Sequence, residues 1–378
     1  MKIIIGWCSD SHLDYNQYGK PQRRKDFSYS LMRTVDDMIE QGVDAIIHTG
    51  DIYNSNRPSS EAVQDIQHLH HLLVAKGKFF YLIRGDHDWC NPPWTDILIP
   101  NQRGGIVLID AYPRIKVGDV TIKGYTKLSR EALLKEFAEA DLKDINILML
   151  HQMVKEFIGF PSPTAISVDE IPDIFQLVAV GDIHIDDIRQ RPMGGWIGYP
   201  GSTEMCSSSE DPKKVWRKLT FVDRELQKIE AVPIHSRPVL QWDVKTDADL
   251  TKYLDEFDQL EVVLKKVDPR EPMIFVKFPT TMPGVLDRIK QKLDPEKYII
   301  VPQPVYVESD SSGLPVPITD DGSEMTVQDI LQLKVPKDDA LFQIASQLLN
   351  PDIDAKVALN SFVEARLAPV KVDETECP

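Results

Sequence analysis

The sequence predicts an α/β protein built around a sheet that is buried on both faces. Short apolar, β-rich runs alternate with longer helical patterns through the first two-thirds of the chain, and this alternation is typical of stacked βα units. The length of 378 residues is enough for one large domain and at least one smaller one. The runs expected to form strands are 2–7, 45–49, 79–83, 105–109, 145–150 and 177–180.

Helices are expected between the first three of these strands, at about 28–41 and 59–75. Ser59 or Ser60 offers a hydroxyl that can accept a hydrogen bond from the first turn of the second helix. These elements belong to a first domain. Its remaining parts are a hairpin at 114–125 and a strand-like stretch at 216–232, which bring the domain to 1–235.

The composition changes after this domain, and a compact second α/β unit is expected at 236–307. Its pattern is strand, helix, strand, helix, strand, beginning at about residue 239. The expected helices are 250–265 and 283–293, and the later strands are 273–278 and 298–307.

The last part of the chain is expected to be a linker followed by a helical tail. Residues 308–323 are rich in Ser, Pro, Asp and Gly, as linkers are. The segment 324–378 is too short to build a core of its own, so its helices are expected to dock on this protein or on a partner. These helices are predicted at about 326–333, 338–349 and 354–367.

Composition and charge exclude several classes of protein. No apolar run reaches the roughly 18 residues that a membrane span needs, and the first residues lack a signal-peptide layout, so a cytoplasmic location is expected. The four cysteines are scattered without a CxxC pair, which excludes zinc fingers and disulfide scaffolds. A net charge of −16 opposes binding to nucleic acid. Metals or a partner must therefore supply the attraction if the substrate is DNA.

Five polar clusters follow predicted strands directly, at the position where open α/β sheets place their ligand sites. Any one of them alone is more often a turn, a helix cap or a satisfied polar residue. All five in register with successive strands are hard to explain in that way. The clusters are Asp10-Ser11-His12, Gly50-Asp51, Gly85-Asp86-His87-Asp88, His151-Gln152 and Gly181-Asp182-Ile183-His184.

The residue types in these clusters indicate a metal site. Carboxylates and imidazoles without thiolates suit divalent cations such as Mn²⁺. Two such ions roughly 3.5–4 Å apart can each hold a phosphate oxygen, activate a water and stabilise the attacking and leaving oxygens. The sequence therefore predicts a dinuclear phosphoesterase with two Mn²⁺ ions, or with Mg²⁺ in their place.

These motifs, with Tyr199-Pro200-Gly201-Ser202 beyond them, resemble those of the calcineurin-like metallophosphoesterases over about residues 1–202. In detail they resemble the DNA-repair branch of that family, the SbcD-type nuclease subunits of bacteria and phages. The resemblance implies a two-sheet sandwich with helices outside, a small α/β capping domain and a C-terminal helical tail. It also implies a homodimer in a bacterial or phage-infected cell that acts on double-stranded DNA ends. Its C-terminal helices would bind an SbcC-type, SMC-like ATPase.

The same resemblance implies roles for individual residues. His87 is implied to protonate the leaving oxygen or to stabilise the transition state, which suits an imidazole near neutral pH. Asp88 is either a support that orients a histidine or a plain turn residue. The implied metal ligands are Asp10, His12 and His184 for the first ion, Asp51 as the bridge, and His151, Asp86 and Asp182 for the second ion.

Two residues depart from the family pattern, and both fall on the second metal. Asp86 stands where the family has Asn, and Asp182 stands where the family has His. Four ionised aspartates would neutralise two divalent cations, so the site would attract a phosphodiester less and lower the pKa of a bound water less. The additional oxygen ligands also favour Mn²⁺ or Mg²⁺ over Zn²⁺.

Three functions are consistent with this reading. The first is an active Mn²⁺-dependent exonuclease or endonuclease of an SbcCD-type complex, and the retention of every histidine motif favours it. The second is a catalytically weakened scaffold that holds DNA ends and the ATPase. The third is a phosphodiesterase for small substrates, which would not need the additional α/β unit or the tail.

Residues beside the metal motifs are expected to contact DNA phosphates or otherwise border the substrate. One set is a basic patch that follows the first motif, and the other lies in the loop after Asp51. These residues are Arg23, Arg24, Lys25, Asn54 and Arg57. The alternative for each set is an ordinary solvated surface or loop that does not contact the substrate.

Overall fold

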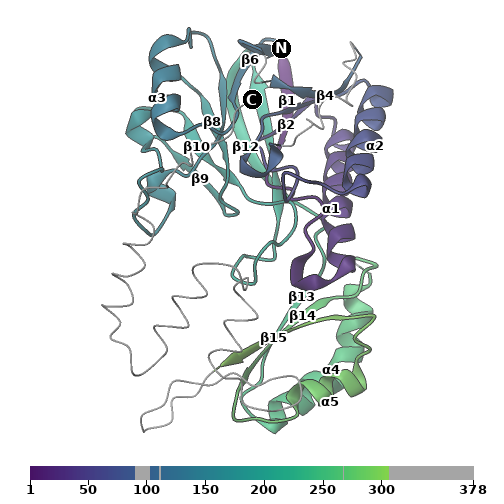
Figure 1. Ribbon diagram of the computed structural model, residues 1–378. Coiled ribbons are helices and arrows are strands. Elements are labelled where there is room, and N and C mark those ends of the chain that lie inside the picture. The colour runs from purple at the N-terminus through teal and green to yellow at the C-terminus, as the bar shows by residue number, and fades with distance from the viewer. Residues whose placement is uncertain (90–102, 110–111, 267, 306–378) are drawn as a thin grey trace, which may run out of the picture. The chain divides into compact units, whose positions relative to one another are not determined.

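Two six-stranded sheets form the main part of the molecule. The computed structural model describes residues 1–89, 103–109, 112–266 and 268–305. The strand order is β12-β11-β1-β2-β3-β4 in the first sheet and β5-β6-β7-β8-β10-β9 in the second. Figure 1 shows α1 and α2 outside one sheet and α3 outside the other. The predicted α/β sandwich with external helices is therefore confirmed for the described residues.

The first sheet has four parallel strands and an antiparallel hairpin. Strand β1 pairs in parallel with β2 on one side and antiparallel with β11 on the other. The hairpin of β11 and β12 agrees with the strand-like stretch predicted at 216–232. The strands are β1 (Lys2–Cys8), β2 (Ala45–His48), β3 (Phe79–Leu82), β4 (Gly105–Leu108), β11 (Val215–Val222) and β12 (Glu225–Pro233).

The second sheet has four parallel strands between two antiparallel edge strands. Strand β6 pairs antiparallel with β5, as the predicted hairpin requires, and in parallel with β7. Strands β9 and β10 were absent from the predicted elements. The strands are β5 (Ile115–Val117), β6 (Val120–Tyr125), β7 (Ile147–His151), β8 (Leu177–Gly181), β9 (Asp186–Gln190) and β10 (Trp196–Pro200).

The core lies between the two sheets. Alternate residues of each strand point to opposite faces, so Ile5 and Trp7 of β1 point inward while Cys8 packs toward the helices. From the second sheet, Ile147 and Met149 of β7 enter the same fully buried cluster. The two sheets are therefore held together by close-packed side chains, and the carboxyl ends of their parallel strands are fixed relative to each other.

Three long helices cover the outer faces of the sandwich: α1 (Pro21–Glu40), α2 (Ser60–Lys76) and α3 (Arg130–Glu139). The Ser59 hydroxyl caps α2 by accepting a hydrogen bond from Ala62 N, as predicted. The predicted start of the first helix was wrong, because α1 begins at Pro21 rather than at about residue 28. Proline is well suited to the first turn of a helix, and this turn buries polar side chains instead of apolar ones.

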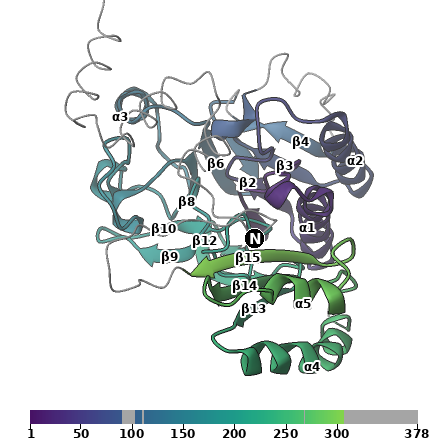
Figure 2. The same ribbon diagram turned by 60° about the horizontal axis from the view of Figure 1, so that its bottom comes forward.

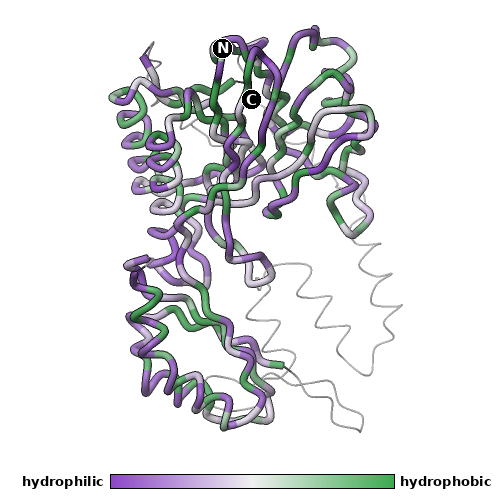
Figure 3. The backbone as a smooth tube through the Cα atoms, turned by 180° about the vertical axis from the view of Figure 1, so that it is seen from behind, coloured by the Kyte–Doolittle hydropathy of each residue, from purple (hydrophilic) through white to green (hydrophobic). Residues whose placement is uncertain are grey.

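A three-stranded sheet with two helices lies within the range predicted for the capping domain. The strands are in the order β13-β14-β15, and Trp242 of β13 stacks on Tyr253 of α4. Figure 2 shows α4 and α5 lying along this sheet, and in Figure 3 hydrophobic and hydrophilic residues alternate along the helices. The elements are β13 (Val239–Asp243), α4 (Asp247–Leu264), β14 (Met273–Pro279), α5 (Val285–Lys292) and β15 (Ile299–Val305).

The predicted linker at 308–323 and the tail helices of 324–378 lie outside the described residues. Most of the described chain, Met1–Phe278 with Gly284–Pro304, forms one compact unit that contains both large sheets. None of the helices among the described residues is both long enough and apolar enough to span a bilayer.

Candidate metal centre

The five predicted clusters meet at one end of the sandwich. Asp10, Asp51 and Asp86 follow β1, β2 and β3 of the first sheet, while His151 and Asp182 come from the ends of β7 and β8 in the second. Hydrogen bonds between the loops link the two sheets here, since Asp182 N donates to Asp10 Oδ1 at 3.1 Å. The structure thus brings together residues that are up to 174 positions apart, from Asp10 to His184.

Asp51 lies at the centre of the cluster. Its Oδ2 atom is 3.4 Å from His151 Nε2 and 3.9 Å from both His12 Nε2 and His87 Nε2. Its other oxygen, Oδ1, accepts a hydrogen bond from His87 N at 3.0 Å. A carboxylate surrounded by imidazole nitrogens in this way can share its oxygens between two cations.

A first group of ligands lies around His12. His12 Nε2 and His184 Nε2 are 3.0 Å apart, and His184 Nε2 is 4.0 Å from Asp10 Oδ1. Cys206 also lies within ligand distance of the two histidines. The prediction of a site without thiols was therefore incomplete, because the chain brings a cysteine sulfur to this end of the sandwich from a loop far along the sequence.

A second group consists of Asp86, His151 and Asp182, whose ligand atoms lie within 4.8 Å of one another. His151 Nε2 is 3.9 Å from Asp86 Oδ2. Lys127 lies beside this group, and its ammonium contacts Asp86 Oδ2 at 2.9 Å and Asp182 Oδ2 at 2.7 Å. The two aspartates that depart from the family pattern are thus joined by a lysine that sequence reasoning had not singled out.

For His151 and His184, neighbouring groups fix which ring nitrogen faces the centre. His151 Nδ1 donates to Thr49 O at 2.8 Å, so Nε2 is left to bind a metal. His184 Nδ1 lies 2.9 Å from Glu210 Oε1, which holds the ring with Nε2 toward the cluster. Carboxylates and carbonyls behind histidines are characteristic of metal sites, where they orient the ring and increase its basicity.

The unpaired polar atoms of the cluster fit divalent cations. Among the described residues, Asp10 Oδ2 and His151 Nε2 are buried and have no hydrogen-bond partner. Buried groups of this kind are costly unless something binds them, and a cation is the partner that suits a carboxylate oxygen and a bare imidazole nitrogen. The group around Asp10, His12, His184 and Asp51 fits a metal directly. The second group fits one only if Lys127 moves.

Burial and mutual charge set the ionisation of the cluster. Burial lowers the pKa of His12 to about 3, and the nearby His184 adds to this effect. Burial raises the pKa of Asp10 to about 6. Burial acts to lower the pKa of His151, but the nearby carboxylate of Asp51 outweighs it and raises the pKa to about 9. Burial would raise the pKa of Asp51, but the contact with His151 outweighs burial and holds this pKa below its usual value. The anionic form of the central carboxylate is therefore favoured.

The backbone of the site is strained in the way that functional loops often are. Asp10, His12, Asp51 and Asp182 have φ values of 51°, 44°, 53° and 101°, a region that residues with a side chain rarely adopt. Gly85 permits close packing here, because a Cβ atom on it would lie 2.1 Å from Asp51 Oδ1. Glycine and strained aspartates together allow the loops of two sheets to converge.

His87 and Asp88 have different surroundings. The His87 side chain is 48% exposed and lies at the open side of the cluster, with its ring centroid 5.4 Å from that of His12. Asp88 is buried, and its two oxygens accept hydrogen bonds from Tyr53 N and Gly85 N. His87 is thus placed to reach a substrate, whereas Asp88 braces the loops that carry Asp51 and Asp86.

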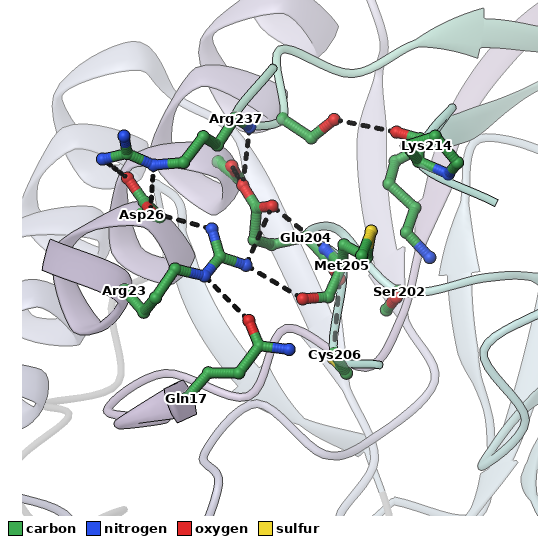
Figure 4. A network of polar contacts seen from close by, with 12 residues as sticks. Gln17, Arg23, Asp26, Ser202, Glu204, Met205, Cys206, Lys214 and Arg237 are labelled. Atoms are coloured by element: carbon green, nitrogen blue, oxygen red, sulfur yellow. Dashed lines mark hydrogen bonds and ion pairs between the residues drawn. The ribbon is translucent and has the colours of Figure 1, made fainter. Parts of the chain in front are cut away.

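One predicted DNA contact was wrong. Arg23 is fully buried, and its guanidinium donates to Asp26, Glu204 and other groups, as Figure 4 shows. The charge of Arg23 is neutralised by buried carboxylates, because the basic run forms the first turns of α1 and not a loop. Arg24 and Lys25 point to solvent, and Arg24 Nε is 3.6 Å from Asp14 Oδ1. Asn54 is half-buried and Arg57 is exposed in the loop after Asp51.

Comparisons with known proteins agree with this geometry. Residues 3–186 match the family model described as calcineurin-like phosphoesterase. The chain is 26% identical over 294 residues to the DNA double-strand break repair protein Mre11 of Methanosarcina acetivorans, a match that covers 75% of this chain and 47% of that protein. It is 26% identical over 293 residues to the Mre11 protein of Thermoplasma acidophilum, covering 70% of this chain and 74% of that one.

A shorter match is closer in sequence. The Mre11 protein of Sulfurisphaera tokodaii is 31% identical over 225 residues, which cover 55% of this chain and 56% of that protein. The chain spans about half the length of the Methanosarcina acetivorans relative. From the motifs, the converging ligands and the matched family model, the segment from residue 3 to residue 186 belongs to the calcineurin-like phosphoesterases, and it is a metallophosphoesterase domain.

Proposed function

We propose that this chain is a Mn²⁺-dependent nuclease that hydrolyses the phosphodiesters of double-stranded DNA ends. The observation that carries the proposal is the cluster in which Asp51 is surrounded by three imidazole nitrogens. The names of the curated relatives, which are DNA double-strand break repair proteins, support DNA as the substrate. The oxygen-rich ligand set supports Mn²⁺, with Mg²⁺ as a substitute.

Different residues of the centre are assigned different roles in the reaction. Divalent cations bound here would supply Lewis acidity to a phosphate oxygen and acidify a water. Asp10, His12, His184 and Asp51 would hold the first cation, while His151 would hold the second with Asp51, Asp86 and Asp182. His87 lies within ligand distance of His12 and Asp51, but we assign its exposed imidazole to the reaction, in which it would donate a proton to the leaving 3′ oxygen.

Two pockets beside the centre support a polyanionic substrate. One, of about 750 Å³, is lined by His184, Lys213 and Lys214 among others. The other, of about 740 Å³, is lined by Lys127 and Arg130 among others. Lys213 is exposed and is proposed to contact a phosphate, whereas Lys214 pairs with Glu210 and Arg130 pairs with Glu170. Arg24, Lys25, Asn54 and Arg57 are proposed as further contacts.

The rest of the chain is proposed to serve assembly. The unit at 236–307 would shape the DNA site as a capping domain, and the segment 324–378 would bind an SbcC-type ATPase in the cytoplasm. The order of segments along the chain supports this proposal, as does a homodimer on the strength of the family resemblance. An end-holding scaffold with weakened catalysis is the second candidate, and the contact of Lys127 with two site aspartates favours it.

The test is Mn²⁺-dependent degradation of linear duplex DNA by the purified chain, alone and with the cognate ATPase. His87→Ala serves as the blank, and His68→Ala, a change of an exposed histidine on α2, serves as the matched control. Degradation by the wild type and by His68→Ala, but not by His87→Ala, would support the nuclease. A folded wild type that remains inactive in both series would contradict it and favour the scaffold.

A further inference from the structure

We propose that the Lys127 ammonium is an internal cation of the metal centre and that a divalent ion reaches the second position only by displacing it. This inference rests on the metal site of the proposed function and deepens it. It makes the two metal positions unequal: the first binds an ion freely, while the second binds one in competition with a side chain of the protein itself.

The geometry places Lys127 where a cation would bind. Its Nζ atom donates to Asp182 Oδ2 at 2.7 Å and lies 2.9 Å from Asp86 Oδ2. Asp86 Oδ2 is also the oxygen that faces His151 Nε2 at 3.9 Å. A divalent ion bound to the carboxylates of Asp86 and Asp182 together with His151 would therefore need an oxygen that the ammonium now holds. Two cations cannot share these atoms at such short distances.

The backbone holds Lys127 in reach of this position. Lys127 N donates to Arg84 O at 2.9 Å, and Arg84 N donates to the Thr126 hydroxyl at 2.8 Å. These bonds join the segment after β6 to the loop that carries Asp86. Because β6 lies in the second sheet and β3 in the first, the lysine crosses from one sheet to the ligands of the other.

Partial burial makes this contact stronger than an ordinary surface ion pair. The side chains of Lys127 and Asp182 are 21% and 19% exposed, while Asp86 is 50% exposed. Solvent and salt screen such a pair less than a fully exposed one. One ammonium also satisfies two carboxylates, which would otherwise repel each other across the position. The ammonium therefore compensates both carboxylates in the form of the centre that the structure shows.

The lysine nevertheless has somewhere to go. It lines the pocket of about 740 Å³ beside the centre, together with Ser129, Glu131 and Gln152. The pocket offers room and polar partners, so the flexible side chain can withdraw into it without breaking the backbone contacts. A divalent ion of higher charge then takes its place beside His151, whose Nε2 has no hydrogen-bond partner among the described residues.

The direct test is the stoichiometry and affinity of Mn²⁺, measured by isothermal titration calorimetry on the full chain. The wild type is expected to bind one ion tightly and a second one much more weakly. Lys127→Met removes the charge and keeps most of the volume, so it should tighten the second site by about tenfold or more. Lys127→Arg keeps the charge and should leave the second site weak.

Controls and a second readout keep the outcomes distinct. Lys135→Met, at an exposed lysine of α3, controls for the loss of one positive charge from the chain. Electron paramagnetic resonance reports spin coupling between neighbouring Mn²⁺ ions, which should appear at a lower Mn²⁺ concentration in Lys127→Met than in the wild type. Circular dichroism establishes that each variant is folded, and Lys127→Gln replaces Lys127→Met if that variant is not.

Either of two results would overturn the inference. One is a wild type with two equally tight sites that Lys127→Met leaves unchanged, and the other is a second site that weakens in Lys127→Met. Both are read from metal binding alone. A chain without nuclease activity can therefore pass this test, and an active nuclease can fail it.

Discussion

Gly85 illustrates how closely the residues of the centre are packed. A Cβ atom at this position would lie 2.1 Å from Asp51 Oδ1 and 2.7 Å from His151 Cε1, so alanine cannot fit without moving two metal ligands. Gly85→Ala is therefore expected to weaken Mn²⁺ binding by at least about tenfold while the sheets remain intact. Calorimetric titration with Mn²⁺, with circular dichroism for the fold, measures both.

Gly159 supplies the matched control, because nothing lies within 4 Å of a Cβ atom built on it. Gly159→Ala should bind Mn²⁺ as the wild type does. If Gly85→Ala also bound Mn²⁺ with unchanged affinity, the loops would be more adaptable than this geometry allows.

Glu210 is a second residue whose effect on the centre is indirect. Its carboxylate contacts Nδ1 of His184. Burial lowers the pKa of His184, but the contacts of this histidine with Cys206 and Glu210 outweigh burial and raise the pKa to about 11. Glu210→Gln removes the charge but keeps the shape, and the loss of a carboxylate behind a metal-binding histidine typically costs 10–100-fold in affinity, so a loss of about tenfold is expected. The measurement is Mn²⁺ affinity at the first site, with Glu225→Gln on the exposed start of β12 as the control. Equal affinity in both variants would contradict the role given to Glu210.

His87 is expected to matter for the reaction and not for metal binding. His87→Ala should retain both Mn²⁺ affinities within a factor of about three and lose hydrolysis by about 10²-fold or more, as removal of a general acid does. Single-turnover cleavage of a linear duplex and calorimetry of Mn²⁺ binding separate the two effects. Undiminished turnover in His87→Ala would contradict the role of His87 as a general acid.

At the scale of elements, helix α1 is tied to the chain that enters the smaller sheet by buried charges. Glu204 accepts hydrogen bonds from Arg23 Nη2 and from Ser30 Oγ, and Arg237 N also donates to it at 3.0 Å. Asp26 accepts from the guanidinium of Arg237 at 2.6 Å. Figure 4 shows this network closing around Glu204, between α1 and the loop after β10.

Breaking one member of this network should be costly. Glu204→Gln removes one of the two carboxylates that pair with the buried Arg23 guanidinium and leaves Asp26 as its remaining counter-charge. Removal of one partner from a buried ion pair costs about 3 kcal/mol of unfolding free energy. Urea unfolding followed by circular dichroism measures the change. Glu230→Gln, on the partly exposed surface of β12, is the control and should change stability by less than about 0.5 kcal/mol. Equal stabilities would mean that the network is not needed for the fold.

The elements that could be predicted are those with a one-sided or fully buried apolar pattern. Strands β1, β2, β3, β7 and β8 were all found, because each is a continuous apolar run. Strand β9 was missed because its sequence, Asp186–Gln190, is an exposed edge with almost no apolar residue. Helix α3 was missed because it buries only Leu133 fully.

The same reasoning explains which site residues could be predicted. The aspartates and histidines that follow strand ends carry a local signal, since parallel strands bring their carboxyl ends together. Lys127 follows β6, but the hairpin pattern concealed that this strand also pairs in parallel with β7. Glu210 and Cys206 lie in a loop without periodicity, and only the tertiary fold brings them to His184.

At the scale of the whole molecule, net charge governs the encounter with DNA. The chain carries 59 acidic and 43 basic residues, so its average field repels a polyanion and only local basic groups attract it. The isolated chain is expected to bind duplex ends weakly, and the affinity should fall steeply as salt increases. Fluorescence anisotropy of a labelled duplex at several salt concentrations, with Mn²⁺ replaced by Ca²⁺ to prevent cleavage, measures this. Salt-resistant nanomolar binding by the lone chain would contradict the expectation.

The division of the ligands between the two sheets has a consequence for the sandwich as a whole. The first sheet contributes Asp10, His12, Asp51 and Asp86, and the second contributes His151, Asp182 and His184. Cations bound between them would act as cross-links across one open edge of the sandwich, joining segments that are far apart in the chain. Without bound ions, the protein should therefore open locally most often at this edge. Amide hydrogen exchange at the ends of β2 and β8 should become slower when ions are added, and the size of this change would measure how strongly the ions join the two sheets.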